Sequence, residues 1–332
     1  MSAPPRAADT AAAADSYQRG QARVAAAAAV AAIAAWRGIN GKALDLSWLA
    51  VLTRLLPIVS GAQRKAAAAA PAYVGELLAL QDAAATAVRL ADGAFAGLTG
   101  DGRPMATLLY APVALAKQRI GAGMRIADAL AAEELHLAVL VRTQVQDAGR
   151  MGLQAAMAAE PKIRGYVRHV NLPACARCII LAGRFYRYSA GFQRHPNCDC
   201  TMIPAAGEQW VESQDPAELI AQMRDQHAAK LRRSLTEGDL KALEHGADLN
   251  QVVNAHRGMS TAAGRSITRE GTTRRGFAGK RLIAEAGSRP GGRYRRAVAV
   301  RLTPAQIFDE AARLNWGRGE IVRQLTRFGY II

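Results

Sequence analysis

The chain has 332 residues, of which half are hydrophobic and 21% are charged, and its mean hydropathy is close to zero. This composition is typical of a soluble protein with two or three compact units, and it excludes a collagen, a mostly disordered chain and a disulfide-dense mini-protein. We find no run of eighteen strongly apolar residues and no signal-peptide pattern at the start, so we expect neither a membrane span nor secretion. Synthesis in a reducing cytoplasm follows from that expectation.

The charge of the chain is strongly positive and unevenly distributed. There are 43 Lys and Arg residues against 27 Asp and Glu, which gives a net charge of +16. Residues 161–332 carry 28 basic and 15 acidic side chains, whereas residues 1–160 carry 15 and 12. A basic half of this kind favours a polyanionic partner, most often nucleic acid. The 36 arginines against 7 lysines also fit a high-GC genome, so solubility alone remains an alternative explanation.

The first half of the sequence predicts helices. Residues 1–15 are small, polar and proline-containing, and we expect a disordered tail. Residues 16–160 are rich in alanine, the residue with the highest helix propensity, and we expect a bundle or hairpin of helices there. In chain order the expected features are a helix capped by Asp15-Ser16 and ending near Trp36, a second from Asp45 or Ser47 with Pro57 in a kink, a third opened by Pro71, a turn over Leu98–Pro104, and a long helix over Arg125–Ala159.

The second half changes in texture at Pro161. Residues 161–205 form a small Cys-rich α+β segment, in which Gly165–Val170 has the alternation of a strand. Residues 206–332 form a basic, mostly helical C-terminal domain. There we expect helical patterning over residues 214–255, a mobile or extended basic loop over Gly264–Arg296, a strand at Ala297–Leu302, a helix over Pro304–Leu314 capped by Thr303, and a final helix over Glu320–Phe328. The predicted fold class is mainly α.

All four cysteines fall within 26 residues, as Cys175-Ala-Arg-Cys178 and Cys198-Asp-Cys200, with His195 three residues before Cys198. Two close pairs separated by a loop are typical of a tetrahedral metal site, because each pair supplies two thiolates at about 2.3 Å from one ion. The C-x-C spacing is less usual than C-x-x-C, because the backbone between the two thiols must bend to aim both at one ion. The last two ligands are therefore either His195 and Cys198 or Cys198 and Cys200. We predict structural zinc, because four protein ligands leave no position for a water molecule.

Three other interpretations of the cysteines remain open. Disulfides are disfavoured by a reducing cytoplasm, and a thioredoxin-like redox motif would need a βαβ context that the sequence does not show. Unliganded buried thiols are the third. His169, near the cluster, is more typical of a partly buried structural histidine than of a fifth ligand. The aromatic residues after Cys178, including Phe185 and Phe192, favour a minimal core around the metal over a base-stacking surface.

Basic residues near the C-terminus are the candidates for contact with DNA phosphates. They are Arg265, Arg269, Arg274, Arg275, Lys280, Arg281, Arg293, Arg295 and Arg296. Such contacts would be independent of DNA sequence and strongly dependent on salt.

The spacing of the cysteines, followed by Leu181-Ala-Gly183, aromatic residues and the string His195-Pro-Asn-Cys198-Asp-Cys200, resembles the signature of the Mu F-like minor head proteins of tailed bacteriophages. Segments such as Asp248–Gly258, Arg269–Gly276 and the C-terminal RLTPAQIF…RQLTRFGYI are similar to versions from actinobacterial phages. The signature itself covers about 40 residues, and the helical first half is compatible with it but not diagnostic.

This resemblance implies a structural virion protein present in few copies inside the capsid near the portal, assembled in the host cytoplasm. Its implied partners are the portal protein, the major capsid or scaffolding protein, and double-stranded DNA; no membrane and no catalytic activity are implied. The alternatives are a zinc-containing DNA-binding regulator, a His-Asn-His-type nuclease and an ADP-ribosylating effector. The nuclease is disfavoured because Pro196 follows His195 and no Asp-His pair occurs in the sequence. The effector is disfavoured because its only candidate motifs are short.

Overall fold

The structure is a computed structural model, which describes residues 7–87, 89–192, 194–196, 198, 200–206, 214–289 and 295–332. The chain divides into two compact units. The first unit comprises Met1–Asn171 and Ala182–Gln214, and the second comprises Leu172–Leu181 and Asp215–Ile332. This division differs from the expected boundaries at residues 160 and 205, because strands of the Cys-rich segment share a hydrophobic core with helices of the first half.

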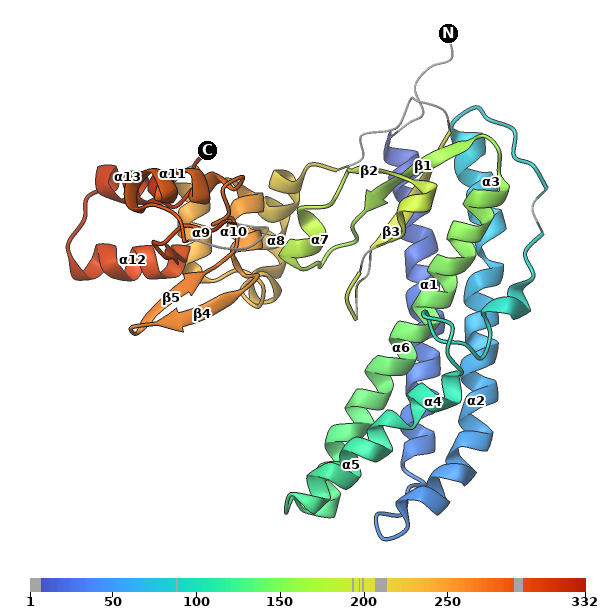
Figure 1. Cartoon of the computed structure of the whole chain (residues 1–332). Helices are drawn as coiled ribbons and strands as arrows, with labels where there is room; N and C mark the ends of the chain where they lie inside the picture. The colour runs from blue at the N-terminus through green and yellow to red at the C-terminus, as the bar shows by residue number, and fades with distance from the viewer. Residues whose placement is uncertain are drawn as a thin grey trace. The chain divides into compact units, whose positions relative to one another are not determined.

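Helices of different lengths build most of the first unit (Figure 1). They are α1 (Ala7–Trp36), α2 (Leu44–Ala68), α3 (Ala70–Leu80), α4 (Met105–Leu109), α5 (Ala111–Gly121) and α6 (Ile126–Ala159), with a 3-10 turn η1 (Asp92–Phe95). The helices α1, α2 and α6 pack against one another, and alanines such as Ala25 and Ala32 let their backbones approach closely. Trp36 and Trp48 meet edge to face in this core, where Leu55, Leu137 and other aliphatic side chains are fully buried.

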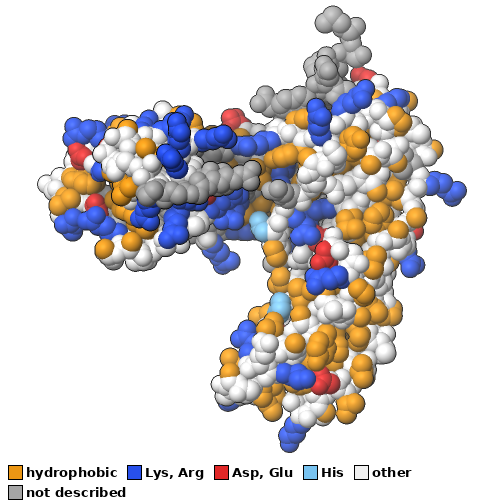
Figure 2. Space-filling view, in the orientation of Figure 1, with side chains coloured by type: hydrophobic (Ala, Val, Ile, Leu, Met, Phe, Trp, Pro, Cys, Tyr) orange, Lys and Arg blue, Asp and Glu red, His pale blue; other side chains and the backbone are white. Residues whose placement is uncertain are grey.

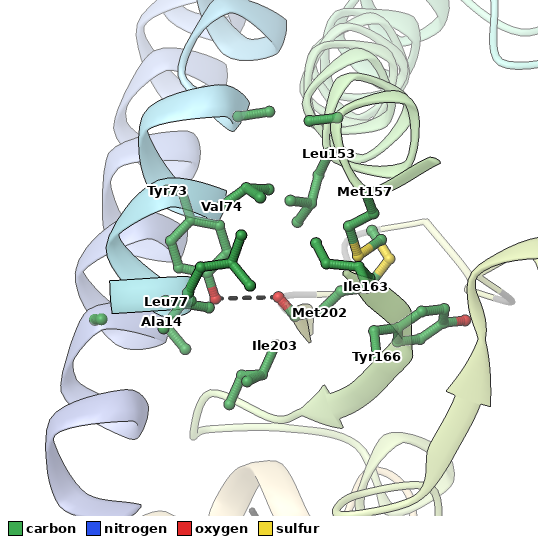
Figure 3. Close-up of a cluster of buried hydrophobic side chains, with 14 of the residues drawn as sticks. Ala14, Tyr73, Val74, Leu77, Leu153, Met157, Ile163, Tyr166, Met202 and Ile203 are labelled. Carbon is green, nitrogen blue, oxygen red and sulfur yellow. Dashed lines mark hydrogen bonds between the residues drawn. The ribbon is translucent and has the colours of Figure 1, made fainter. Parts of the chain in front are cut away.

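A three-stranded antiparallel sheet closes the first unit. Its strands are β1 (Ile163–His169), β2 (Phe185–Arg187) and β3 (Thr201–Ala206), in the order β2-β1-β3, with the 3-10 turn η2 (Tyr188–Ala190) after β2. The apolar side chains of β1 and β3 join those of α3 and α6 in a second core (Figure 3). The buried Tyr73 hydroxyl donates to the Met202 carbonyl oxygen at 3.0 Å, which links α3 to β3 through a satisfied polar group.

The stretch Leu44–Leu80 is long and apolar enough to cross a membrane by length and composition alone, with a mean hydropathy of 1.4 over an eighteen-residue window. The expectation that the chain has no such run was therefore wrong, because alanine and leucine outweigh the scattered charges. In the structure, α2 packs on α1 and α6 and buries Trp48, Val51 and Leu55 in the core of the bundle.

The second unit combines short helices with a small antiparallel sheet. Its elements are α7 (Ala176–Ile179), α8 (Pro216–Leu231), α9 (Glu237–Glu244), α10 (Leu249–Ala255), β4 (Met259–Ala262), β5 (Arg265–Thr268), α11 (Phe277–Ala286), β6 (Arg301–Leu302), α12 (Pro304–Arg313) and α13 (Arg318–Arg327). Arg301 is fully buried, where its Nε donates to the Phe328 carbonyl and its Nη1 to that of Glu270, and its guanidinium stacks on Tyr330. Carbonyl oxygens thus solvate this charge and fix the C-terminal residues.

The sequence predicted the fold class correctly: the protein is mainly α with small antiparallel sheets. Thr303 caps α12 as expected, by accepting a hydrogen bond from the Gln306 N–H. The expected disordered tail was wrong for residues 7–15, because α1 begins at Ala7 and Asp15 lies inside it rather than at its cap. The high helix propensity of the preceding alanines explains the earlier start. Residues 1–6 lie outside the described part of the chain.

Two further expectations differ from the structure. The region 264–296, expected to be an extended loop, contains β5 and α11. The helix α11 is anchored by the buried Leu282, and Gly279 lets its backbone pack directly against residues 272 and 273. The expected strand Ala297–Leu302 is reduced to Arg301–Leu302 and an isolated bridge at Ala297. Pro57, for which a kink was expected, lies inside α2.

The crossing of α2 and α6 depends on Gly152. A Cβ atom at this position would lie 2.8 Å from the Ala67 Cα and 2.9 Å from its carbonyl oxygen. We expect Gly152→Ala to lower the free energy of unfolding by about 1–3 kcal/mol, because two backbones must move apart. Gly61→Ala, on the exposed side of α2 with open space around it, should instead add about 0.5–1 kcal/mol through helix propensity. Urea denaturation of both variants measures this difference, and equal stability of the two would contradict it.

Candidate metal centre and basic surface

The first cysteine pair lies on one helical turn of the second unit. Cys175 occupies the N-cap of α7, and its carbonyl oxygen accepts the Cys178 N–H at 3.0 Å. This turn places the two Sγ atoms 3.6 Å apart. Two thiolates bound at 2.3 Å to one tetrahedral ion lie about 3.8 Å apart, so the pair already has nearly the spacing that a shared ion requires.

The remaining donors, His195, Cys198 and Cys200, come from the segment that leads into β3 of the first unit. The Cys198 N–H donates to the His195 carbonyl oxygen at 3.2 Å, and both cysteines are buried. The His195 Nδ1 lies 2.8 Å from the Pro196 carbonyl oxygen. Since a carbonyl can only accept, Nδ1 carries the proton, and Nε2 keeps the lone pair that a metal ion would bind.

The ligand atoms of the five predicted residues fall into two groups. Those of Cys175, Cys178 and His195 lie within 4.8 Å of one another, as do those of Cys178, Cys198 and Cys200. None of these four cysteines, all in the described part of the chain, is in a disulfide. The five residues therefore form a cluster that could hold a metal ion, and its soft sulfur and imidazole donors suit zinc. Cys178 belongs to both groups.

Buried arginines that the sequence did not identify surround Cys198 within the first unit. Arg168 on β1 is 3% exposed, and its Nη2 lies 3.8 Å from the Cys198 Sγ. Arg150 on α6 donates to the carbonyl oxygen of Cys198 and, at 3.4 Å, to that of Cys200. The Arg168 guanidinium lies over the Phe192 ring at 4.3 Å, which supports the expectation that this aromatic residue packs in a core around the cluster.

An acidic residue, Asp147, completes this arrangement. Its buried carboxylate pairs with Arg150 at 3.3 Å and also contacts Arg194. Burial raises the pKa of Asp147, and the two arginines offset only part of that rise. A signal was present in the sequence, because Asp147 and Arg150 interrupt the apolar face of the long helix α6 with an i,i+3 pair of opposite charge.

The buried His169 has a structural partner rather than a metal, as the sequence favoured. Its Nε2 lies 2.8 Å from Asp15 Oδ1, which also accepts a hydrogen bond from the Asn171 side chain. These contacts connect α1 to the end of β1. The hydrogen bond from His169 is the main cause that lowers the pKa of Asp15 below its ordinary value of 3.8.

We expect Asp15→Asn to lower the free energy of unfolding by about 1 kcal/mol at neutral pH. Because the folded-state pKa of Asp15 is depressed, its contribution is complete above about pH 4 and is lost as the pH falls through the folded-state value. The stability gap between wild type and variant should therefore narrow as the pH falls below 3.8 in urea denaturation. Glu76→Gln, an exposed change on α3, should show no gap at neutral or acidic pH. A gap that stays constant as the pH is lowered would contradict the assignment.

Lys and Arg side chains gather over the second unit (Figure 2). In this unit the backbone at Arg295 and Arg296 is hydrogen-bonded to two other segments, from Arg274 N to Arg295 O and from Arg289 N to Arg296 O, both at 3.0 Å. Arg296 Nη1 also donates to the Arg269 carbonyl oxygen at 2.6 Å. We define the basic surface by Arg269 and by the exposed cations on these three segments and on α11. They are Arg269, Arg274, Arg275, Lys280, Arg289, Arg295 and Arg296. Six were predicted, and Arg289 is an addition that the sequence did not single out.

Two of the predicted DNA-contacting residues, Arg265 and Arg281, stand apart from this surface. Arg265 forms an ion pair with Glu310 at 3.1 Å. Arg281 is half-buried and donates to the carbonyl oxygens of Thr326 and Ile331, so it holds the C-terminal segment. Arg293 lies outside the described residues. The sequence alone does not distinguish an exposed arginine from one that forms ion pairs or hydrogen bonds within the protein.

A helical unit, a thiol-rich cluster and a basic unit define a class of protein that combines packing surfaces with a group of side chains that could hold a metal ion. The sequence matches the family described as VG15 protein over residues 8–226, a range that contains the entire helical bundle, the sheet and all five candidate ligands. The chain therefore belongs to this family of phage proteins. No curated protein and no solved structure matches the chain.

Proposed function

We propose that this phage protein is a minor structural component of the virion, located inside the head near the portal, where it assists head assembly and DNA packaging or ejection. The observation that carries the proposal is the basic surface of the second unit in a chain that belongs to a phage family. The resemblance of the cysteine segment to Mu F-like minor head proteins supports the same role. Double-stranded DNA, contacted through phosphates without sequence preference, is the partner of the basic surface.

The helical unit supplies the protein contacts in this proposal. Leu46 and Leu49 on α2 and Leu135 on α6 are 75%, 60% and 67% exposed. Contiguous exposed apolar side chains mark surfaces that bind another protein, and Leu46 and Leu49 are neighbours at an i,i+3 spacing on α2. The proposed partner is the portal protein, with the major capsid or scaffolding protein as the next contact.

Zinc has a structural role in the proposal. Four ligands drawn from Cys175, Cys178, His195, Cys198 and Cys200 would fill a tetrahedral shell, so no coordination position remains for a reacting water molecule. The bound ion would supply folding free energy, since thiolates and imidazole ligate it only when the segment is folded.

Co-expression with the portal protein of the same phage tests the location. We expect the two proteins to co-purify and to elute together in size-exclusion chromatography. Replacing both Leu46 and Leu49 with Glu should weaken the complex, while Leu314→Glu, a similarly exposed position in the second unit, should not. Separate elution of the wild-type proteins would contradict a portal-associated role.

The protein acts without catalysis in this proposal. Incubation with supercoiled plasmid and magnesium or manganese should therefore leave the plasmid intact. Cleavage that disappears in a His195→Asn variant would instead support the nuclease alternative.

A further inference from the structure

The buried guanidinium groups of Arg150 and Arg168 place positive charge close to Cys198. Arg150 and Arg168 are 8% and 3% exposed, and Arg194 is joined to Arg150 through Asp147. Arginine stays protonated in proteins, so the positive charge of each guanidinium is permanent. A buried charge is costly unless an opposite charge or hydrogen-bonding groups accompany it.

Zinc bound by four thiolates carries two negative charges in excess, and zinc bound by three thiolates and one imidazole carries one. From the 3.8 Å contact between Arg168 Nη2 and Cys198 Sγ, and from the Arg150 hydrogen bonds to the carbonyl oxygens of Cys198 and Cys200, we infer that the two arginines are positioning residues that hold this cysteine pair and neutralise an anionic zinc–thiolate centre. The inference rests on the proposed zinc site and adds its electrostatic requirement.

The two arginines have different tasks. Arg150 binds the backbone carbonyl oxygens of both Cys198 and Cys200, so it holds these two residues in place as ligands of one ion. Arg168 acts on the sulfur itself, and the Phe192 ring under its guanidinium holds it in place. A hydrogen bond to a ligating sulfur spreads the negative charge of the metal–thiolate unit, as outer-sphere partners do in other metal sites.

The test is zinc affinity, measured on the full-length protein by competition with a chromophoric chelator. We expect Arg168→Met to weaken zinc binding about 10- to 100-fold, the usual cost of losing an outer-sphere partner. Arg168→Lys, which keeps the charge, should recover most of that loss. Arg164→Met is the matched control, because Arg164 lies on the same strand but is exposed, and it should bind zinc like wild type. Cobalt(II) substitution should give the same thiolate charge-transfer bands in all variants that bind metal, showing that the ligand set is unchanged.

The possible outcomes separate the inference from the proposal beneath it. If wild type binds no zinc, the proposed metal centre fails, and the inference fails with it. If wild type binds zinc and Arg168→Met binds it equally well, the metal centre stands and the role of Arg168 is overturned. Should Arg168→Met fail to fold with zinc present, Arg194→Gln decides, since that side chain is 27% exposed and shares the Asp147 carboxylate with Arg150. We expect a smaller loss of affinity there, and unchanged affinity would overturn the inference.

Discussion

Replacing Cys178 with serine should abolish tight zinc binding and lower the free energy of unfolding by more than about 4 kcal/mol, the range reached when a protein loses a structural metal. Cys178 is the most sensitive position because its Sγ belongs to both groups of candidate ligands. A folded unit of about 150–250 residues loses about 2–4 °C of melting temperature per kcal/mol of stability. A loss of more than about 4 kcal/mol should therefore lower the melting temperature by at least about 8 °C. Metal content by mass spectrometry and thermal melting under reducing conditions measure the two effects.

Arg177→Gln is the matched control, because Arg177 lies between the two cysteines and is exposed. It should retain zinc and melt like wild type. A chelator adds a second check: it should lower the melting temperature of wild type and of Arg177→Gln, but leave Cys178→Ser unchanged, since that variant has no ion to lose. Zinc-free wild type, or equal melting of wild type and Cys178→Ser, would refute the metal centre.

The helical half of the fold could be predicted because its local signals agree with its packing. Alanine propensity and the apolar periodicity of residues 125–159 both predict the helix that the structure contains as α6. The start of α1 was missed because Asp15 has the chemistry of an N-cap but is used by His169 instead. A side chain with a tertiary partner gives the same local signal as one that caps a helix.

The candidate ligands could be predicted from spacing, whereas their surroundings could not. Close pairs of cysteines are recognised within a few residues of sequence, and the chain places all five predicted donors in one cluster. Arg150 on α6 and Arg168 on β1 reach Cys198 only through tertiary packing. Likewise, Arg281 resembles its basic neighbours in sequence, yet the fold uses it to bind backbone carbonyls. The burial of a charge depends on the whole fold, so a sequence pattern does not reveal it.

Neutralising four residues of the basic surface should weaken DNA binding about 100-fold or more near 100 mM salt. The variant carries Gln at Arg274, Arg275, Lys280 and Arg295, all exposed. Each phosphate contact contributes about 0.9 to the slope of log K against log salt, so the slope should become shallower by about 3 to 4. Fluorescence anisotropy with short duplexes of equal length and unrelated sequence, at salt concentrations from about 50 to 500 mM, measures both quantities. Wild-type affinity should be the same for each duplex, since phosphates carry no sequence information.

A control with the same loss of charge separates a defined surface from a general attraction to a basic protein. Gln at Arg233, Arg313, Arg318 and Lys241 also removes four exposed cations from the second unit, but none of them belongs to the basic surface as defined above. If DNA contacts the basic surface, this variant keeps most of the wild-type affinity and slope, because the phosphate contacts that set the slope are left in place. Equal losses in both variants would show that net charge alone attracts the DNA. A wild-type affinity that does not change with salt would exclude phosphate contact as its basis.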